Sequence, residues 1–206
     1  MTDRFVFELL GAMAYGELSA FERLSSDARF SPTLQDRAAL GRMAVAEFRH
    51  FELVSDRLAD LGHDAEAAMR PFQVSVDAFH DRTRPADWYE SIMKAYVIDT
   101  ISADFYSAVS QFLDAPTRDL VAEIQDPEES SVLQARLRGM VRDDPRLASR
   151  LALWGRRLVG EALTQAQRLS LEGGFLPEGV ASFQGPLMAE LTKNHSRRMS
   201  QLGLTA

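Results

Sequence analysis

One stretch, residues 40–61, constrains the fold of this chain more than any other. Apolar residues recur through it at the spacing of an α-helix with one apolar face. Glu47 and His50 lie three residues apart in the middle of that face, so both side chains are predicted to point into whatever the helix packs against. Burying either group without a partner is costly. The motif is therefore either half of a metal site inside a helical bundle or a structural carboxylate–imidazole pair.

Composition narrows the class of protein. The chain has 206 residues, enough for one domain or one domain with a tail, and 46% of them are hydrophobic. Its net charge of −7 makes it a poor general binder of nucleic acid. Cysteine is absent, which excludes disulfides, thiolate metal sites and a cysteine nucleophile. No apolar run approaches the ~18 residues of a membrane span, so we expect a soluble, cytoplasmic protein.

Capping residues, prolines and glycines divide the chain into helices, and no stretch has the alternation of a strand. Between residues 63 and 85 the pattern is less regular, and we expect a short helix from Asp64 to Met69 that Pro71 breaks. The other predicted helices cover residues 3–27, 32–61, 85–113, a fourth that opens at 114, 145–173 and about 186–201.

The order of these segments predicts an all-α fold. A four-helix bundle with a long crossover can be built from two helices, a longer connection and two more helices. In this chain a fifth helix follows. We expect residues 1–174 to form this bundle and residues 175–206 to form a short helical tail that packs on it. The third helix is apolar on two sides, which places it at the centre or at an interface.

A bundle metal site needs carboxylates from further helices. On the first helix Glu17 has apolar neighbours at helical spacing, whereas Glu22 lies among serines, so Glu17 is the inward candidate. On the third helix Asp99 lies on an apolar stripe, with Asp104 in reserve. Each acid alone has a second interpretation, a hydrogen bond to a core tyrosine. Acids on the apolar faces of three helices favour a cation, because buried carboxylates repel one another.

The fourth helix lacks a second Glu-x-x-His. The segment Asp126-Pro127-Glu128-Glu129 has acids at both ends and no histidine. An aspartate cap, a proline at the first position and a glutamate at the third form a capping box, which is the interpretation we favour for Asp126 and Glu129. The alternative is that these carboxylates, Glu129 above all, are metal ligands.

The remaining polar candidates are weaker. Glu161 interrupts an apolar stripe of the fifth helix, and we expect it to pair with Arg157. The tail carries the chain's one basic cluster, which either indicates an anionic partner or forms a solvated helix face. The other histidines have no second ligand at metal spacing and are expected in solvent: His63, His80 and His195.

Taken together, these residues resemble the ferritin-like superfamily. Glu17 resembles its first-helix ligand, Glu47 and His50 its second-helix motif, and Asp99 stands where a third-helix glutamate is usual. The layout over roughly residues 3–172 is similar to the branch that contains the tRNA hydroxylase acting on 2-methylthio-N6-isopentenyladenosine, and to actinobacterial ferritin-like proteins of unassigned role. Two segments carry much of this likeness, residues 14–18 and 151–161.

The resemblance implies a bundle that holds two iron ions, or manganese, and activates dioxygen. Glu17, Glu47 and His50 would hold one ion, and Glu47, Asp99 and Asp126 or Glu129 a second. The missing fourth-helix histidine leaves one ion, an altered pair or no metal as alternatives. Two classes of function follow. The first is a non-haem iron oxidoreductase or hydroxylase acting on a small molecule or a modified nucleoside. The second is a metal-free bundle, expected as a homodimer, that acts as a binding or scaffold protein.

Overall fold

The computed structural model describes residues 2–125, 127–173 and 184–205, and within them the side chains of all but 2–3, 127–129, 165–173 and 184. This part of the chain is helical and contains no strand, which confirms the all-α prediction. None of its helices is both long enough and apolar enough to cross a membrane. The helices are α1 (Thr2–Asp27), α2 (Leu34–Asp60), α3 (Ala65–Arg82), α4 (Trp88–Val109), α5 (Ala115–Ile124), α6 (Pro127–Arg142), α7 (Pro145–Gly173) and α9 (Gln184–Gln201).

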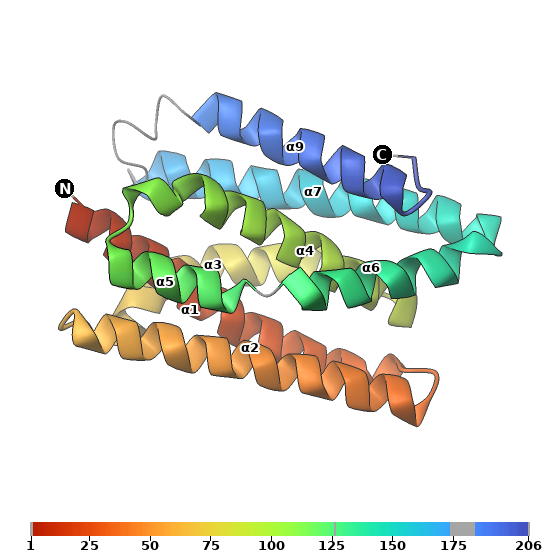
Figure 1. Cartoon of the computed structure of the whole chain (residues 1–206), viewed down its shortest axis with the longest axis horizontal. Coiled ribbons are helices and arrows are strands. Elements are labelled where there is room, and N and C mark those ends of the chain that lie inside the picture. Colours follow the sequence, from red (N-terminus) through yellow and green to blue (C-terminus); the bar gives the residue numbers. More distant parts are fainter. Residues whose placement is uncertain (1, 126, 174–183, 206) are drawn as a thin grey trace.

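The helices form a bundle of two pairs joined by a crossover. Figure 1 shows α1 and α2 side by side along one edge, with α3 packed on α1 and leading across to the second half. Helix α4 lies in the middle and contacts α1, α6, α7 and α9, as expected for a helix that is apolar on two sides. Helices α5 and α6 follow one another along one face, and α9 lies along α7.

The ends of α2 follow local chemistry. Helix α2 begins two residues after the predicted start at residue 32: Thr33 is the cap, and its Oγ1 accepts a hydrogen bond of 3.1 Å from the amide of Asp36. At the other end Gly62 adopts a left-handed conformation with φ of 79°. The amide of His63 then donates to the carbonyl of Leu58 at 2.9 Å, which closes the helix within one residue of its predicted end at residue 61.

The predicted break at Pro71 is wrong. Helix α3 runs through that proline, from its cap at Asp64 to Arg82. Ala68, Phe72 and Phe79 are all buried, so the apolar stripe continues at helical spacing on both sides of the proline. Packing of that stripe offsets the lost backbone hydrogen bond, which costs about 3 kcal/mol in an isolated helix.

The predicted fourth helix is two helices. Helix α5 ends at Ile124, and α6 begins at Pro127, where a proline at the first helical position loses no hydrogen bond. Asp126, the predicted cap and candidate ligand, lies outside the described residues. The fifth helix begins as predicted, because Asp144 Oδ1 accepts hydrogen bonds from the amides of Arg146 and Leu147.

The core divides into two clusters that meet along α4. One lies between α1, α2, α3 and α5 and includes Leu9, Val54 and Phe72. The other lies between α4, α6, α7 and α9 and includes Leu137 and Leu158. Helix α4 contributes six buried residues to the second cluster and Val109 to the first. A polar side chain at the centre of the bundle, where the two clusters meet, is therefore surrounded by other helices.

Gly11 lets α1 approach α3 closely, which generates a prediction. A Cβ at Gly11 would lie 2.3 Å from the carbonyl oxygen of Ala68, a backbone atom that cannot move alone. Gly11→Ala should therefore lower the free energy of unfolding by about 1–3 kcal/mol. The control is Gly41→Ala in α2, where a Cβ meets nothing within 4 Å and stability should rise by up to about 1 kcal/mol. Urea denaturation measures both, and equal effects would contradict the prediction.

Candidate metal centre

The first half of the site comes from two neighbouring helices. On α1, Glu17 lies on the same face as Met13 and Leu24, both buried. On α2, Glu47 and His50 lie between buried Ala44 and Val54. The apolar faces of the two helices pack together, so the polar residues that interrupt them meet, as the sequence predicted.

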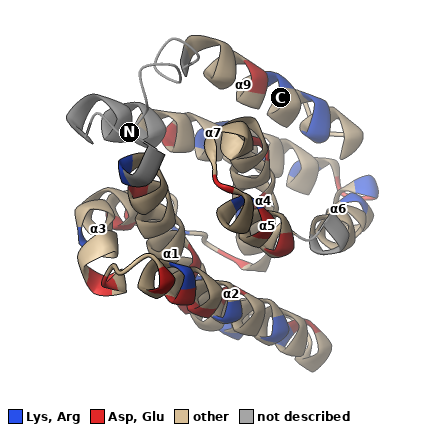
Figure 2. Ribbon diagram, turned by 60° about the vertical axis from the view of Figure 1, so that its left-hand side comes forward, with Lys and Arg blue, Asp and Glu red and all other residues tan. Residues whose placement is uncertain are grey.

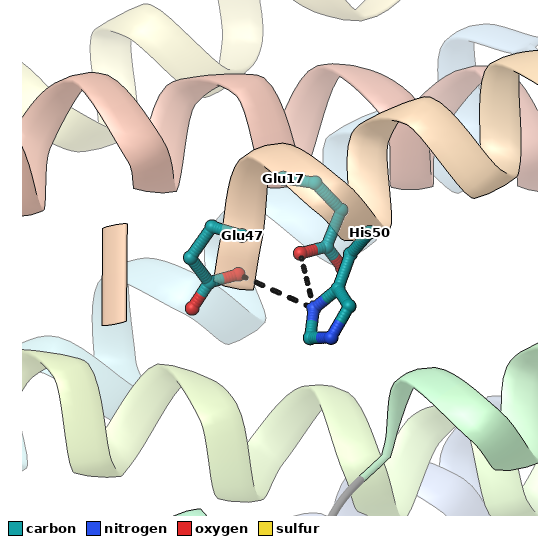
Figure 3. Close-up of side chains that lie close together, drawn as sticks. All are labelled: Glu17, Glu47 and His50. Carbon is teal, nitrogen blue, oxygen red and sulfur yellow. Dashed lines mark ion pairs between the residues drawn. The ribbon is translucent and has the colours of Figure 1, made fainter. Parts of the chain in front are cut away.

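Glu17, Glu47 and His50 form a compact group. His50 Nδ1 lies 3.6 Å from Glu17 Oε2 and 3.9 Å from Glu47 Oε2, and Figure 3 shows both carboxylates turned toward the imidazole. One ligand atom from each residue lies within 4.8 Å of the others. The three side chains are between 13% and 23% exposed. Three potential ligands thus converge in a partly desolvated place.

The electrostatics of the group favour a cation. Burial raises the pKa of Glu47, and the nearby Glu17 carboxylate adds to this. The carboxylates of Glu17 and then Glu47 raise the pKa of His50, so the imidazole carries a proton at neutral pH. Without a metal, the pKa of Glu47, raised to about 8, keeps that acid mostly protonated at neutral pH, and the protonated imidazole balances the charge of Glu17.

The donor set fits a divalent transition-metal ion. Bonds from such an ion to imidazole nitrogen or carboxylate oxygen are about 2.1 Å long, so two donors on one ion lie at most about 4.2 Å apart. Both distances from His50 Nδ1 are within that limit. Imidazole nitrogen with carboxylate oxygen is a donor set suited to iron, manganese and zinc. Binding would release the imidazole proton, because a histidine ligand is neutral.

Asp99 lies near this group without joining it. It lines the same cavity from α4 and accepts a hydrogen bond from Ser130 Oγ. Burial raises the pKa of Asp99, and the charge of Glu47 raises it further. The reserve candidate, Asp104, is engaged elsewhere, in a two-pronged pair with Arg198 at 2.6 and 2.7 Å.

The fourth-helix candidates cannot be placed in the same way. Asp126 and the side chain of Glu129 lie outside the described part of the structure, so their roles as caps or ligands stay predictions.

Basic and acidic residues alternate along α2 in Figure 2, whereas α9 carries basic residues toward its C-terminal end. Of these, Arg198 is neutralised by Asp104, which reduces the basic character of the predicted tail cluster.

Three other sequence predictions need correction. Glu161 pairs with Arg82 at 2.8 Å rather than with Arg157, which instead donates to the backbone carbonyl of Arg82. His80 and His195 are buried, not solvated, with 9% and 4% of their surface exposed. The partner of Glu161 is 79 positions away in the chain, and that of His80 lies on the next helix.

The group of Glu17, Glu47 and His50 opens onto a cavity of about 360 Å³ in the middle of the bundle. Glu17, Glu47, His50 and Asp99 line one part of it. The walls are otherwise mostly apolar, as in typical small-molecule sites. Among the apolar lining residues are Leu9, Met43, Ile98, Ile101, Phe105, Leu163 and Leu191.

A buried lysine in the same cavity escaped the sequence analysis. Lys94 is 7% exposed, and its Nζ lies 3.0 Å from His80 Nδ1 and donates to the carbonyl of Thr83 at 2.9 Å. Burial lowers the pKa of Lys94 to about 7 and that of His80 to about 3, so His80 is neutral and its Nδ1 can accept. One signal was available: the chain has only two lysines, and this one lies on a helix apolar on two sides.

The architecture and the carboxylate–histidine group define a ferritin-like helical protein. A model of the family described as "Ferritin-like domain, actinomycetes" matches residues 1–182, so the chain belongs to that family. No curated protein matches the chain. The family match gives no specific support to the tRNA hydroxylase branch.

Burial of Lys94 generates a prediction about pH. Between the native pKa of about 7 and the ordinary value of about 10.4, the unfolded chain binds more protons, so stability rises with pH. From about pH 7 to about pH 9, Lys94 should add on the order of 2 kcal/mol to the free energy of unfolding. Lys94→Met should abolish this increment in urea denaturation, whereas Lys193→Met, at an exposed position, should retain it. Parallel pH profiles for all three proteins would refute the prediction.

Proposed function

We propose that this protein binds one iron ion through Glu17, Glu47 and His50 and oxidises a small apolar substrate in the adjoining cavity. The observation that carries the proposal is the convergence of two carboxylates and an imidazole on one wall of an apolar cavity. Carboxylate and imidazole are the ligands of non-haem iron sites in this type of bundle. Manganese fits the same donors and is the alternative metal.

Each residue has a distinct role in the proposal. Glu17 and Glu47 supply the negative charge that holds the ion, and His50 supplies a neutral nitrogen donor. A bound iron(II) ion supplies dioxygen binding and electron transfer, chemistry that protein side chains do not provide. Tyr106 also lines the cavity, and burial raises the pKa of its phenol, so it stays protonated as a hydrogen-bond donor. The apolar walls exclude water from the substrate.

A two-ion site is the finer alternative. It would add Asp99 from α4, with Asp126 or Glu129 from the region between α5 and α6. Asp99 faces the same cavity and its carboxylate interacts with that of Glu47, which supports the alternative. The missing histidine argues against it, because a site of carboxylates alone retains more negative charge. We therefore propose a single ion and treat the number of ions as measurable.

A metal-free binding protein is the second candidate function. His50 already forms ion pairs with both carboxylates, so the group is balanced without a metal. In that case the apolar cavity alone carries the function, as a site for a small ligand. Oxidation of a modified nucleoside, cytoplasmic location and a homodimer stay predictions from the sequence, and the net charge of −7 argues against binding to tRNA.

The metal proposal predicts a specific loss. Protein expressed with iron and manganese should contain about one ion per chain, and Glu47→Gln should reduce this to background in elemental analysis. A bound ion present at 100 times its dissociation constant stabilises the fold by ~2.7 kcal/mol, so the wild type alone should gain thermal stability when metal is added. The matched control is Glu52→Gln, an exposed position on the same helix, which should keep the ion. Background metal in the wild type would leave the metal-free candidate.

A substitution at Asp99 distinguishes a one-ion site from a two-ion site. If one ion binds at Glu17, Glu47 and His50, Asp99→Asn should leave the metal content at about one per chain. The substitution keeps the shape of the side chain and removes only its charge, so the fold should be retained. Elemental analysis of both proteins decides the matter: a content that falls from two ions to one would establish the two-ion site.

A further inference from the structure

The cavity has a second polar wall that the metal group does not use. Arg23 on α1 and Lys94 on α4 both line it, together with Asp27 and Ser91. Lys94 is nine-tenths buried and is one of only two lysines in the chain. Buried cations are rare in protein interiors unless they have a partner or a function.

The two polar walls lie at different levels of the bundle. Arg23 is six residues beyond Glu17 on α1, a rise of about 9 Å, and Lys94 is five residues before Asp99 on α4, about 7.5 Å. The two shifts run in the same direction, because Ser91 Oγ donates to Asp27 Oδ2 at 2.8 Å and so places the end of α1 beside the start of α4. Apolar residues of the two helices, among them Ala20, Ala95 and Ile98, separate the levels.

The cationic wall has more positive than negative charge. Lys94 Nζ contacts His80 and the carbonyl of Thr83, which leaves its third N–H without a partner in the described structure. Nε of Arg23 is buried and has no hydrogen-bond partner among the described residues. Asp27 lines the same wall and interacts electrostatically with both, and it forms no ion pair within 4.0 Å with either in the part of the chain that is described. Among the residues that line this wall, two cations thus face one carboxylate, and Asp81 acts on Lys94 from outside the lining.

We infer that the cavity binds an apolar monocarboxylic acid, with its carboxylate at Arg23 and Lys94 and its apolar body directed toward Glu17, Glu47 and His50. A carboxylate matches the planar donors of arginine and the free N–H of lysine. The apolar walls match the body of the ligand. A second carboxylate at the far end is disfavoured, because it would meet three acids, so the ligand is a monoacid.

The charge of Lys94 is consistent with such a ligand. Burial lowers the pKa of Lys94 to about 7, which reflects the cost of an ammonium ion without a counter-ion. A bound carboxylate would supply that counter-ion and raise the pKa again. Where it concerns a reaction, this inference rests on the proposed function. In that case the substrate is an acid, and its apolar carbons, not its carboxylate, face Glu17, Glu47 and His50. Binding itself does not require the metal.

The test uses metal-free protein, with decanoate as the probe and decanol as its uncharged match. Isothermal titration calorimetry should show that the wild type binds decanoate at least tenfold more tightly than decanol. Lys94→Met and Arg23→Gln should each weaken decanoate binding about tenfold, the loss of one charged hydrogen bond, and change decanol binding less than threefold. Lys193→Met should change neither. Equal losses for both probes, or no binding of decanoate, would overturn the inference.

A second measurement does not depend on the variants folding. With only two lysines, the ¹³Cε signals of the wild type can be assigned by comparison with Lys193→Arg. Titration by NMR should show that decanoate raises the pKa of Lys94 by at least one unit, whereas decanol does not, and that Lys193 is unaffected by either. An unchanged Lys94 pKa in saturating decanoate would refute contact between the acid and this lysine.

The two proposals can fail separately. Decanoate binding is measured on metal-free protein and metal content is measured without decanoate, so neither result depends on the other. Decanoate binding by a wild type that takes up no metal would sustain the acid site and reject the metal centre. One ion per chain with no decanoate binding would do the reverse.

Discussion

The structure depends on how two carboxylates are accommodated inside an apolar bundle. Glu17 and Glu47 come from adjacent helices and would repel each other at low dielectric. His50 lies within 4 Å of both and supplies the balancing charge. Around this group the same problem recurs on α4, where Asp104 is matched by Arg198 and Asp99 accepts from Ser130. These buried charges are thus paired with an opposite charge or with a hydrogen-bond donor. The cavity, in contrast, is lined by Arg23 and Lys94, which lack a full set of partners among the described residues.

Much of the fold follows from local patterns. Caps and glycines located most helix ends, because Asp144 and Gly62 act on backbone groups only a few residues away. Glu17, Glu47 and His50 were also predictable, since a polar residue on an otherwise apolar helix face must find a partner across the interface. Among the candidate ligands, these are the ones that local periodicity alone identifies as inward on a helix pair in direct contact.

The incorrect predictions for Pro71 and Glu161, and the missing prediction for Lys94, have one physical cause. It is packing between helices that are distant in sequence. Pro71 should end a helix on propensity alone, yet burial of Phe72, which lies beside Gly11 of α1, and of Phe79 sustains it. Glu161 found Arg82 across a helix interface instead of a neighbour on its own helix. No prediction was made for Lys94, because helices that cover α4, such as α7 and α9, are distant from it in sequence. A local sequence pattern does not indicate which surface will be covered by a helix that is distant in sequence.

The distribution of contacts along the chain implies an order of assembly. Glu17, Glu47 and His50 belong to a single hairpin of α1 and α2, which can form as soon as the first third of the polypeptide leaves the ribosome. Asp104, by contrast, pairs with a residue 94 positions further on, and Met199 of α9 completes the packing over α7. Glu17, Glu47 and His50 can therefore come together during synthesis before α4 and α9 enclose them.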